Sequence, residues 1–99
     1  MDYEKVKEQI REVLDEAKDW VYATSEARDY YERISGYWYF YVRVGVDFRG
    51  NRFIIASVDA DGFEPLRMHL DPFSLKGKYL DSIITSFTEC FEQGIQEER

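Results

Sequence analysis

The chain has 99 residues, of which 44% are hydrophobic and 17% aromatic, and its net charge is −7. This composition excludes an intrinsically disordered chain, and the length is typical of a single domain. The negative charge argues against direct binding to nucleic acid or to an anionic membrane, because both select basic surfaces. We therefore expect one α+β domain spanning residues 1–99.

The single cysteine, Cys90, excludes an intramolecular disulfide and is typical of a reducing compartment. The charged residues 1–5 lack the basic start and the apolar centre of a signal peptide. The longest apolar and aromatic run, residues 37–42, is far shorter than the ~20 residues of a membrane-spanning helix. We expect a cytoplasmic protein with no membrane partner.

Residues 3–34 show a helical period, because apolar side chains recur at steps of three and four positions. No proline or glycine interrupts this span, and Gly36 is placed to end it. A single helix of this length would measure ~48 Å, whereas typical strands reach only ~20 Å. The pattern predicts an N-terminal helical segment that is either one long helix or, as we favour, two shorter helices with a break near residues 23–25.

The strongest strand signal lies at residues 36–48. Every even position from Trp38 to Phe48 is apolar, and three of the odd positions are Tyr37, Tyr39 and Tyr41. Successive side chains of a strand point to opposite faces of a sheet. One face of this strand should therefore line the core, and the other should present tyrosines.

Gly50 and Asn51 fit a two-residue hairpin turn, which would pair Phe48 with Phe53 in the next strand. That second strand, residues 53–58, is apolar on both faces over its first part. Strands of this kind are usually central and covered on both sides. We therefore expect another layer over each face of the sheet at this strand.

A turn at residues 59–62 precedes a third strand at residues 63–70, which Pro65 marks as an edge strand because proline cannot donate a ladder hydrogen bond. A helical pattern starts at Lys78, and Gly94 is placed to end it. The predicted fold class is α+β, a three-stranded antiparallel meander with an N-terminal helical segment and a C-terminal helix. The predicted core consists of Trp38, Phe40, Val42, Val44, Val46, Ile55, Leu66, Met68, Ile83, Ile84 and Phe87.

Acidic residues recur along the predicted N-terminal helix, and neighbours four positions apart on a helix lie ~5–6 Å apart. Phosphates along a nucleic-acid strand have a similar spacing, so such a row can imitate a nucleic-acid backbone. The interleaved bases also allow ion pairs such as Glu4–Lys7 and Glu8–Arg11, which are typical of an ordinary solvated face. The candidate partner-binding acids are Glu4, Glu8, Glu12, Asp15, Glu16 and Asp19.

Tyr37, Tyr39 and Tyr41 form a second candidate for partner binding. Tyrosine is enriched in binding surfaces, since it offers a large contact area, few rotatable bonds and a polar tip. The alternative is that part of the N-terminal segment packs over these rings as a second layer. The sequence leaves the two interpretations about equally supported.

Signals for catalysis and metal binding are weak. His69 is the only histidine, and Asp59, Asp61 and Glu64 are the carboxylates that would assist it. The Asp59-x-Asp61-Gly62 turn lacks the further ligands of a calcium loop. We expect no catalytic residues, no metal site and no cofactor.

The first hypothesis for the function is a non-catalytic inhibitor that occupies a basic, nucleic-acid-binding site on a partner protein. Anti-defence proteins such as anti-CRISPR proteins, and toxin-neutralising immunity proteins, act in this way; the analogy is one of class and not of sequence. An alternative is a self-associating adaptor that forms a homodimer through the N-terminal helix. A further alternative is a small enzyme that uses His69 with the nearby carboxylates.

Overall fold

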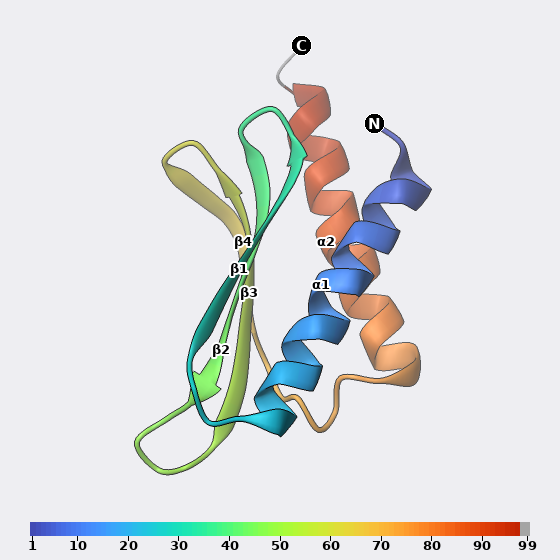
Figure 1. Cartoon of the computed structure of the whole chain (residues 1–99). Coiled ribbons are helices and arrows are strands. Elements are labelled where there is room, and N and C mark those ends of the chain that lie inside the picture. Colours follow the sequence, from blue (N-terminus) through green and yellow to red (C-terminus); the bar gives the residue numbers. More distant parts are fainter. Residues whose placement is uncertain (98–99) are drawn as a thin grey trace.

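The computed structural model describes residues 1–97, which form two helices and four strands (Figure 1). In chain order the elements are α1 (Tyr3–Ala23), β1 (Arg28–Ser35), β2 (Trp38–Val46), β3 (Arg52–Ala60), β4 (Phe63–Leu70) and α2 (Gly77–Glu97). The strands form one antiparallel sheet in the order β1-β2-β3-β4. Both helices lie side by side on one face of this sheet. The predicted α+β class is confirmed, and the sheet has four strands where three were predicted.

The core lies between the sheet and the helices, and it includes Trp38, Phe40, Val42 and Val44 of β2 as predicted. Of the other predicted core residues, Leu66 and Met68 are half-buried against the core, and Val46 is half-buried and not part of it. Phe40 is fully buried, and its ring centroid lies 5.0 Å from that of Phe87 and 6.4 Å from that of Phe91, both on α2. Helix α1 contributes a stripe of buried side chains that follows the helical period: Val6, Ile10, Val13, Leu14, Ala17 and Val21. The two helices and β2 therefore share one hydrophobic core.

The N-terminal segment contains one helix followed by a strand, so the prediction of helix up to residue 34 is wrong. The predicted break is in place, because α1 ends at Ala23 and Thr24 has extended backbone angles of φ −149° and ψ 160°. Beyond the break, Tyr30 is buried and Tyr31 is 65% exposed, which is the alternation of a strand. The helical period continued by coincidence, and pairing with β2 decides the conformation by satisfying the backbone groups of both strands.

The predicted two-residue turn between β2 and β3 is also wrong. The loop is longer, Val46 pairs with Arg52, and Phe48 is 93% exposed in the loop instead of pairing with Phe53. Oδ1 of Asp47 accepts hydrogen bonds from the backbone N–H groups of Arg49 and Asn51, both at 2.9 Å. These bonds stabilise the wider turn. The pairing of β2 with β3 is therefore shifted by three residues from the predicted register.

The carboxylate of Asp47 should therefore contribute to stability, although it is exposed. We expect Asp47→Ala to lower the free energy of unfolding by about 1 kcal/mol, because two backbone donors lose their acceptor. Asp47→Asn is the matched control, since its side-chain oxygen can accept the same bonds and should recover most of this loss. Urea denaturation of the three proteins measures the difference, and equal stability of the alanine and asparagine variants would show that the bonds are not needed.

The second face of the sheet has no helix over it in the part of the chain that the structure describes (Figure 1). Two predictions about β3 are therefore wrong, because β3 is covered on one side only and Ile55 lies on the open face instead of in the core. The predicted edge position of β4 is confirmed, and its bounds agree with the prediction. We call the uncovered surface the open face; its side chains come from the odd positions of β2 and β3 and from the residues of β1 and β4 that pair with them.

Helix α2 does not end at Gly94, contrary to the prediction, and continues to Glu97. A Cβ atom at position 94 would lie 2.3 Å from Cη2 of Trp38 and 2.7 Å from its Cζ2. The absence of a side chain at Gly94 therefore lets the indole ring of Trp38 pack against the helix. Gly94 therefore allows α2 and β2 to approach each other closely, and it does not end the helix.

Candidate partner-binding surfaces

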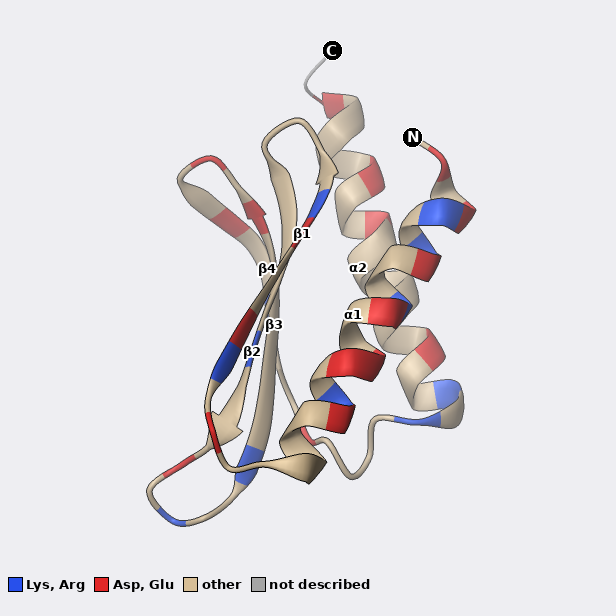
Figure 2. Cartoon of the chain, viewed as in Figure 1, with Lys and Arg blue, Asp and Glu red and all other residues tan. Residues whose placement is uncertain are grey.

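The six candidate acids of α1 are all exposed, on the side of the helix that faces away from the sheet. The stripe that starts at Val6 points into the core, and the acids occupy the opposite arc of the same helix. Figure 2 shows that acidic residues recur along the whole of α1. The helix thus presents a continuous acidic face, which we define as Glu4, Glu8, Glu12, Asp15, Glu16 and Asp19.

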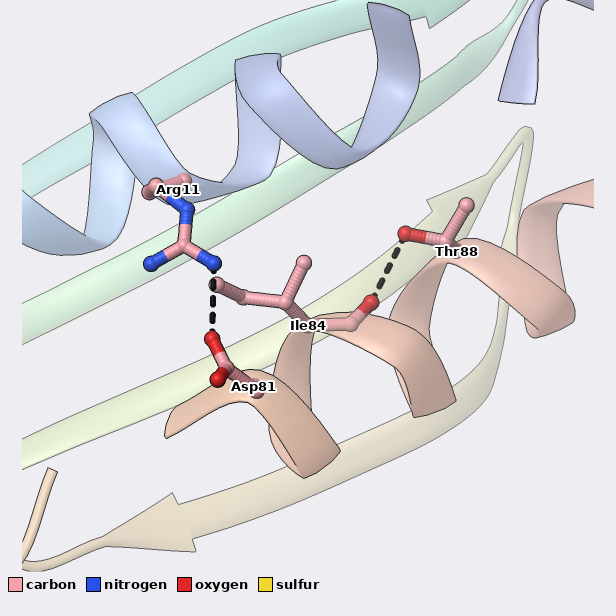
Figure 3. A network of polar contacts seen from close by, with 4 residues as sticks. All are labelled: Arg11, Asp81, Ile84 and Thr88. Atoms are coloured by element: carbon pink, nitrogen blue, oxygen red, sulfur yellow. Dashed lines mark hydrogen bonds and ion pairs between the residues drawn. The ribbon is translucent and has the colours of Figure 1, made fainter. Parts of the chain in front are cut away.

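Helix α1 has four bases, of which Lys5 is exposed on the same side as the acids and the other three have contacts elsewhere. Arg11 reaches across to α2, where its Nη2 lies 2.8 Å from Oδ1 of Asp81 (Figure 3). Lys18 Nζ donates to the backbone oxygen of Leu75 at 2.8 Å, and Lys7 Nζ lies 5.7 Å from the ring centroid of Tyr3. Within residues 1–97, no ion pair includes an acid of the acidic face, so the anticipated i,i+3 pairs do not form.

This separation of charge follows from the positions of the bases along the helix. Residues 7, 11 and 18 follow one another at steps of four and seven, so they share one flank of α1. That flank faces α2 and the segment before it, where Asp81 and the Leu75 carbonyl are located. Three of the four bases of α1 therefore lie on the flank towards α2, and the outward side carries the six acids with only Lys5 among them.

The tyrosines lie on the other side of the molecule. Tyr39 and Tyr41 are half-buried on the open face, and Tyr37, just before β2, is 46% exposed. The later part of the N-terminal segment is strand β1, which pairs beside β2 in the same sheet, so the prediction of a second layer over these rings is wrong. The structure therefore separates the predicted partner-binding residues into two surfaces, the acidic face of α1 and the open face of the sheet.

The open face also includes Tyr31, which the sequence analysis missed because it assigned residue 31 to a helix. Its ring is stacked on that of the paired Tyr41, with centroids 4.6 Å apart. The hydroxyl of Tyr41 donates to Oδ1 of Asp29 at 2.9 Å, and Nε of Arg43 lies 3.7 Å from the same oxygen. The sequence holds no clear signal for Tyr31, because the apolar side chains of residues 28–35 fit a helical period as well as an alternating one.

Burial is the main cause that raises the pKa of Tyr41 above its ordinary value of 10.0, and the hydrogen bond to Asp29 raises it further. The folded protein therefore holds this proton more tightly than the unfolded chain, so the associated stability is present below pH 10 and is lost as the pH rises through the folded pKa.

We expect Tyr41→Phe to lose less stability than the wild type above pH 10. Urea denaturation at several alkaline pH values tests this, and parallel pH profiles would contradict it.

The residues considered for catalysis do not assemble into a common site. His69 is exposed on β4, and its ring centroid lies 6.0 Å from that of Phe53. His69 pairs with Ile55 of β3, four residues along that strand from Asp59, and Oε1 of Glu64 lies 4.0 Å from Nη1 of Arg67. Burial raises the pKa of the Cys90 thiol, which keeps it protonated at neutral pH. Among residues 1–97, no three histidine, cysteine or acidic side chains are grouped as metal ligands would be.

The apolar stripe of α1, which was an alternative surface for a homodimer, packs on the protein's own sheet and second helix. Val6, Ile10 and Leu14 are at most 3% exposed. Dimerisation through this stripe would require the helix to leave the core. The stripe is therefore not an exposed surface on which a second copy could bind.

Neither of the two helices in residues 1–97 combines the length and the apolar character that crossing a bilayer requires. Comparison with known proteins found no matching family model, no similar curated protein and no similar solved structure. Inferences about function therefore depend on the two surfaces described above.

Proposed function

We propose that this is a non-catalytic protein-binding protein that uses the acidic face of α1 to occupy a basic surface on a partner protein. The observation that carries the proposal is that six exposed carboxylates share one side of a helix and none forms an ion pair within residues 1–97. Carboxylates in this state offer their full charge to a partner. Complementary charge mainly increases the association rate and the specificity of a complex.

The chemistry of the partner follows from the spacing of these acids. Side chains one helical turn apart lie ~5–6 Å from each other, as successive phosphates do along a nucleic-acid strand. A protein surface that binds phosphates therefore fits the acidic face, and its occupation would inhibit nucleic-acid binding. An inhibitor of the anti-CRISPR or immunity-protein class would act in this way.

The test is an affinity pull-down from a native lysate at low and at high salt, followed by binding measurements with the purified partner. We compare the triple variant Glu8→Gln, Glu12→Gln, Asp15→Asn with a control of equal charge, Glu26→Gln, Glu89→Gln, Glu92→Gln. The α1 variant should weaken binding roughly tenfold and flatten its salt dependence, because three exposed charge contacts at a few tenths to 1 kcal/mol each are lost. The control variant should bind as the wild type does.

Three results would count against the proposal. Binding that does not weaken with salt would exclude an interaction driven by charge. Equal losses in both variants would show that net charge matters and that the acidic face of α1 does not. Recovery of the protein alone, as a stable dimer, would favour self-association through a surface other than the buried stripe of α1.

A further inference from the structure

A second site lies on the open face, at the end of the sheet where the β1–β2 and β3–β4 turns meet. The site is a shallow hollow of about 340 Å³, and none of its lining side chains belongs to the core. Another hollow, of about 440 Å³, is lined partly by the core residue Trp38. The hollow on the open face is lined by Tyr31, Tyr37, Tyr39, Asp59 and Asp61. Three aromatic rings and two carboxylates thus surround one small space.

The strand register brings these residues together. Tyr39 on β2 pairs directly with Asp59 on β3, so both side chains point to the open face. Tyr31 on β1 pairs with Tyr41 and is the diagonal neighbour of Tyr39, at a distance that aromatic side chains can span. Tyr37 lies in the β1–β2 turn and Asp61 in the β3–β4 turn, at the same end of the sheet. The hollow is therefore fixed by β pairing and not by the conformation of a long loop.

The two carboxylates have no cationic partner in the described residues. Asp59 is half-buried and accepts one hydrogen bond, from Ser57 Oγ to Oδ1 at 2.8 Å. Asp61 is exposed in the turn, and neither residue takes part in an ion pair within residues 1–97. Arg33, which pairs with Tyr39 across β1 and β2, donates from Nε to the backbone oxygen of Gly36 at 2.9 Å instead.

The rings are similarly free of cations. The cation–π contacts of the described chain use the rings of Tyr3, Trp20, Tyr30 and Phe48, and none uses a ring of the hollow. The face of a tyrosine ring carries negative electrostatic potential and attracts ammonium and guanidinium groups. Carboxylates beside such rings add charge of the same sign.

We propose that this hollow binds an organic cation, the ammonium or guanidinium head group of a lysine or arginine side chain or of a small quaternary amine. A volume of about 340 Å³ leaves room for one such group. Two carboxylates beside three tyrosine rings are too few for a divalent metal, because calcium takes six to eight oxygen ligands and magnesium a near-octahedral set of oxygens. The site is separate from the acidic face of α1 and does not depend on the function proposed for that face.

The experiment is an NMR titration of the isotope-labelled protein with choline and with its neutral isostere 3,3-dimethyl-1-butanol. N-acetyl-lysine methylamide, its trimethyllysine counterpart and N-acetyl-arginine methylamide are titrated in the same way. Cations should shift the signals of Tyr31, Tyr37, Tyr39, Asp59 and Asp61, and the neutral isostere should not. Binding of the amino-acid amides assigns the site to a protein side chain, whereas binding of choline alone assigns it to a free amine.

Variants locate the binding within the hollow. Asp59→Asn keeps an acceptor for Ser57 and should weaken cation binding about fivefold, and Tyr39→Ala should weaken it at least as much. Glu89→Gln and Tyr79→Ala, which are exposed on α2 and belong to neither surface, are the controls and should bind as the wild type does. Equal shifts by choline and its neutral isostere, or unchanged binding by Asp59→Asn, would overturn the proposal. Neither result would affect the test of the acidic face of α1, which uses a partner protein.

Discussion

Replacing Phe40 by alanine is expected to lower the free energy of unfolding by about 3–5 kcal/mol, the usual loss for a large aromatic side chain in a core. Phe40 is 0% exposed at the centre of β2, and its ring makes edge contacts with Phe87 and Phe91. Its removal would leave a cavity between the sheet and α2. Because domains of this size have only about 5–15 kcal/mol of stability, the variant should be close to unfolding at room temperature.

Phe48 provides the matched control for this measurement. It has the same side chain, but it is 93% exposed in the β2–β3 loop, so Phe48→Ala should change stability by no more than about 0.5 kcal/mol. Urea denaturation followed by circular dichroism gives both values. A loss below 1 kcal/mol for Phe40→Ala would mean that α2 does not pack on β2 as described.

Replacing Gly94 by alanine should destabilise the protein by about 1–3 kcal/mol, as overpacking of a core usually does. The sign is informative, because alanine normally stabilises a helix interior by about 1 kcal/mol relative to glycine. Here the added Cβ would lie 2.3 Å from the indole ring of Trp38, so the ring or the helix must move. Thermal or urea denaturation of Gly94→Ala measures which effect is larger.

A double-mutant cycle separates the two effects. In a Trp38→Leu background the clash is removed, and Gly94→Ala should then stabilise the protein relative to Trp38→Leu alone. Ser82→Ala, at an exposed position of the same helix, serves as the control for helix propensity. Destabilisation of equal size in both backgrounds would show that the contact with Trp38 is not the cause.

The sequence predicts the parts of the fold whose pattern is unambiguous. Alternation from Trp38 to Val46 predicts β2 and the side that faces the core, and Pro65 predicts the edge position of β4. Residues 28–35 could not be assigned, because their apolar side chains fit a helical period as well as an alternating one. Only the unpaired edge of β2, a property of the folded sheet, favours the strand.

The candidate surfaces were likewise predictable in part, where a sequence pattern decides the arrangement, and unpredictable where contacts distant in sequence decide it. Helical periodicity alone predicts that the acids of α1 share one exposed side. The freedom of those acids from ion pairs could not be predicted, because it depends on Asp81 and on the Leu75 carbonyl, which are far from Arg11 and Lys18 in sequence. The hollow on the open face was missed because its walls come from three strands, one of which was assigned as a helix.

The strand order also has a consequence for the folding kinetics. Each strand pairs with its neighbour in sequence, so the sheet can form by closing short loops, which carry little entropic penalty. The contact between Arg11 and Asp81, in contrast, joins residues 70 positions apart. We expect the docking of α1 against α2 to follow the transition state for folding. Substitutions between the helices should then raise the unfolding rate and leave the folding rate nearly unchanged.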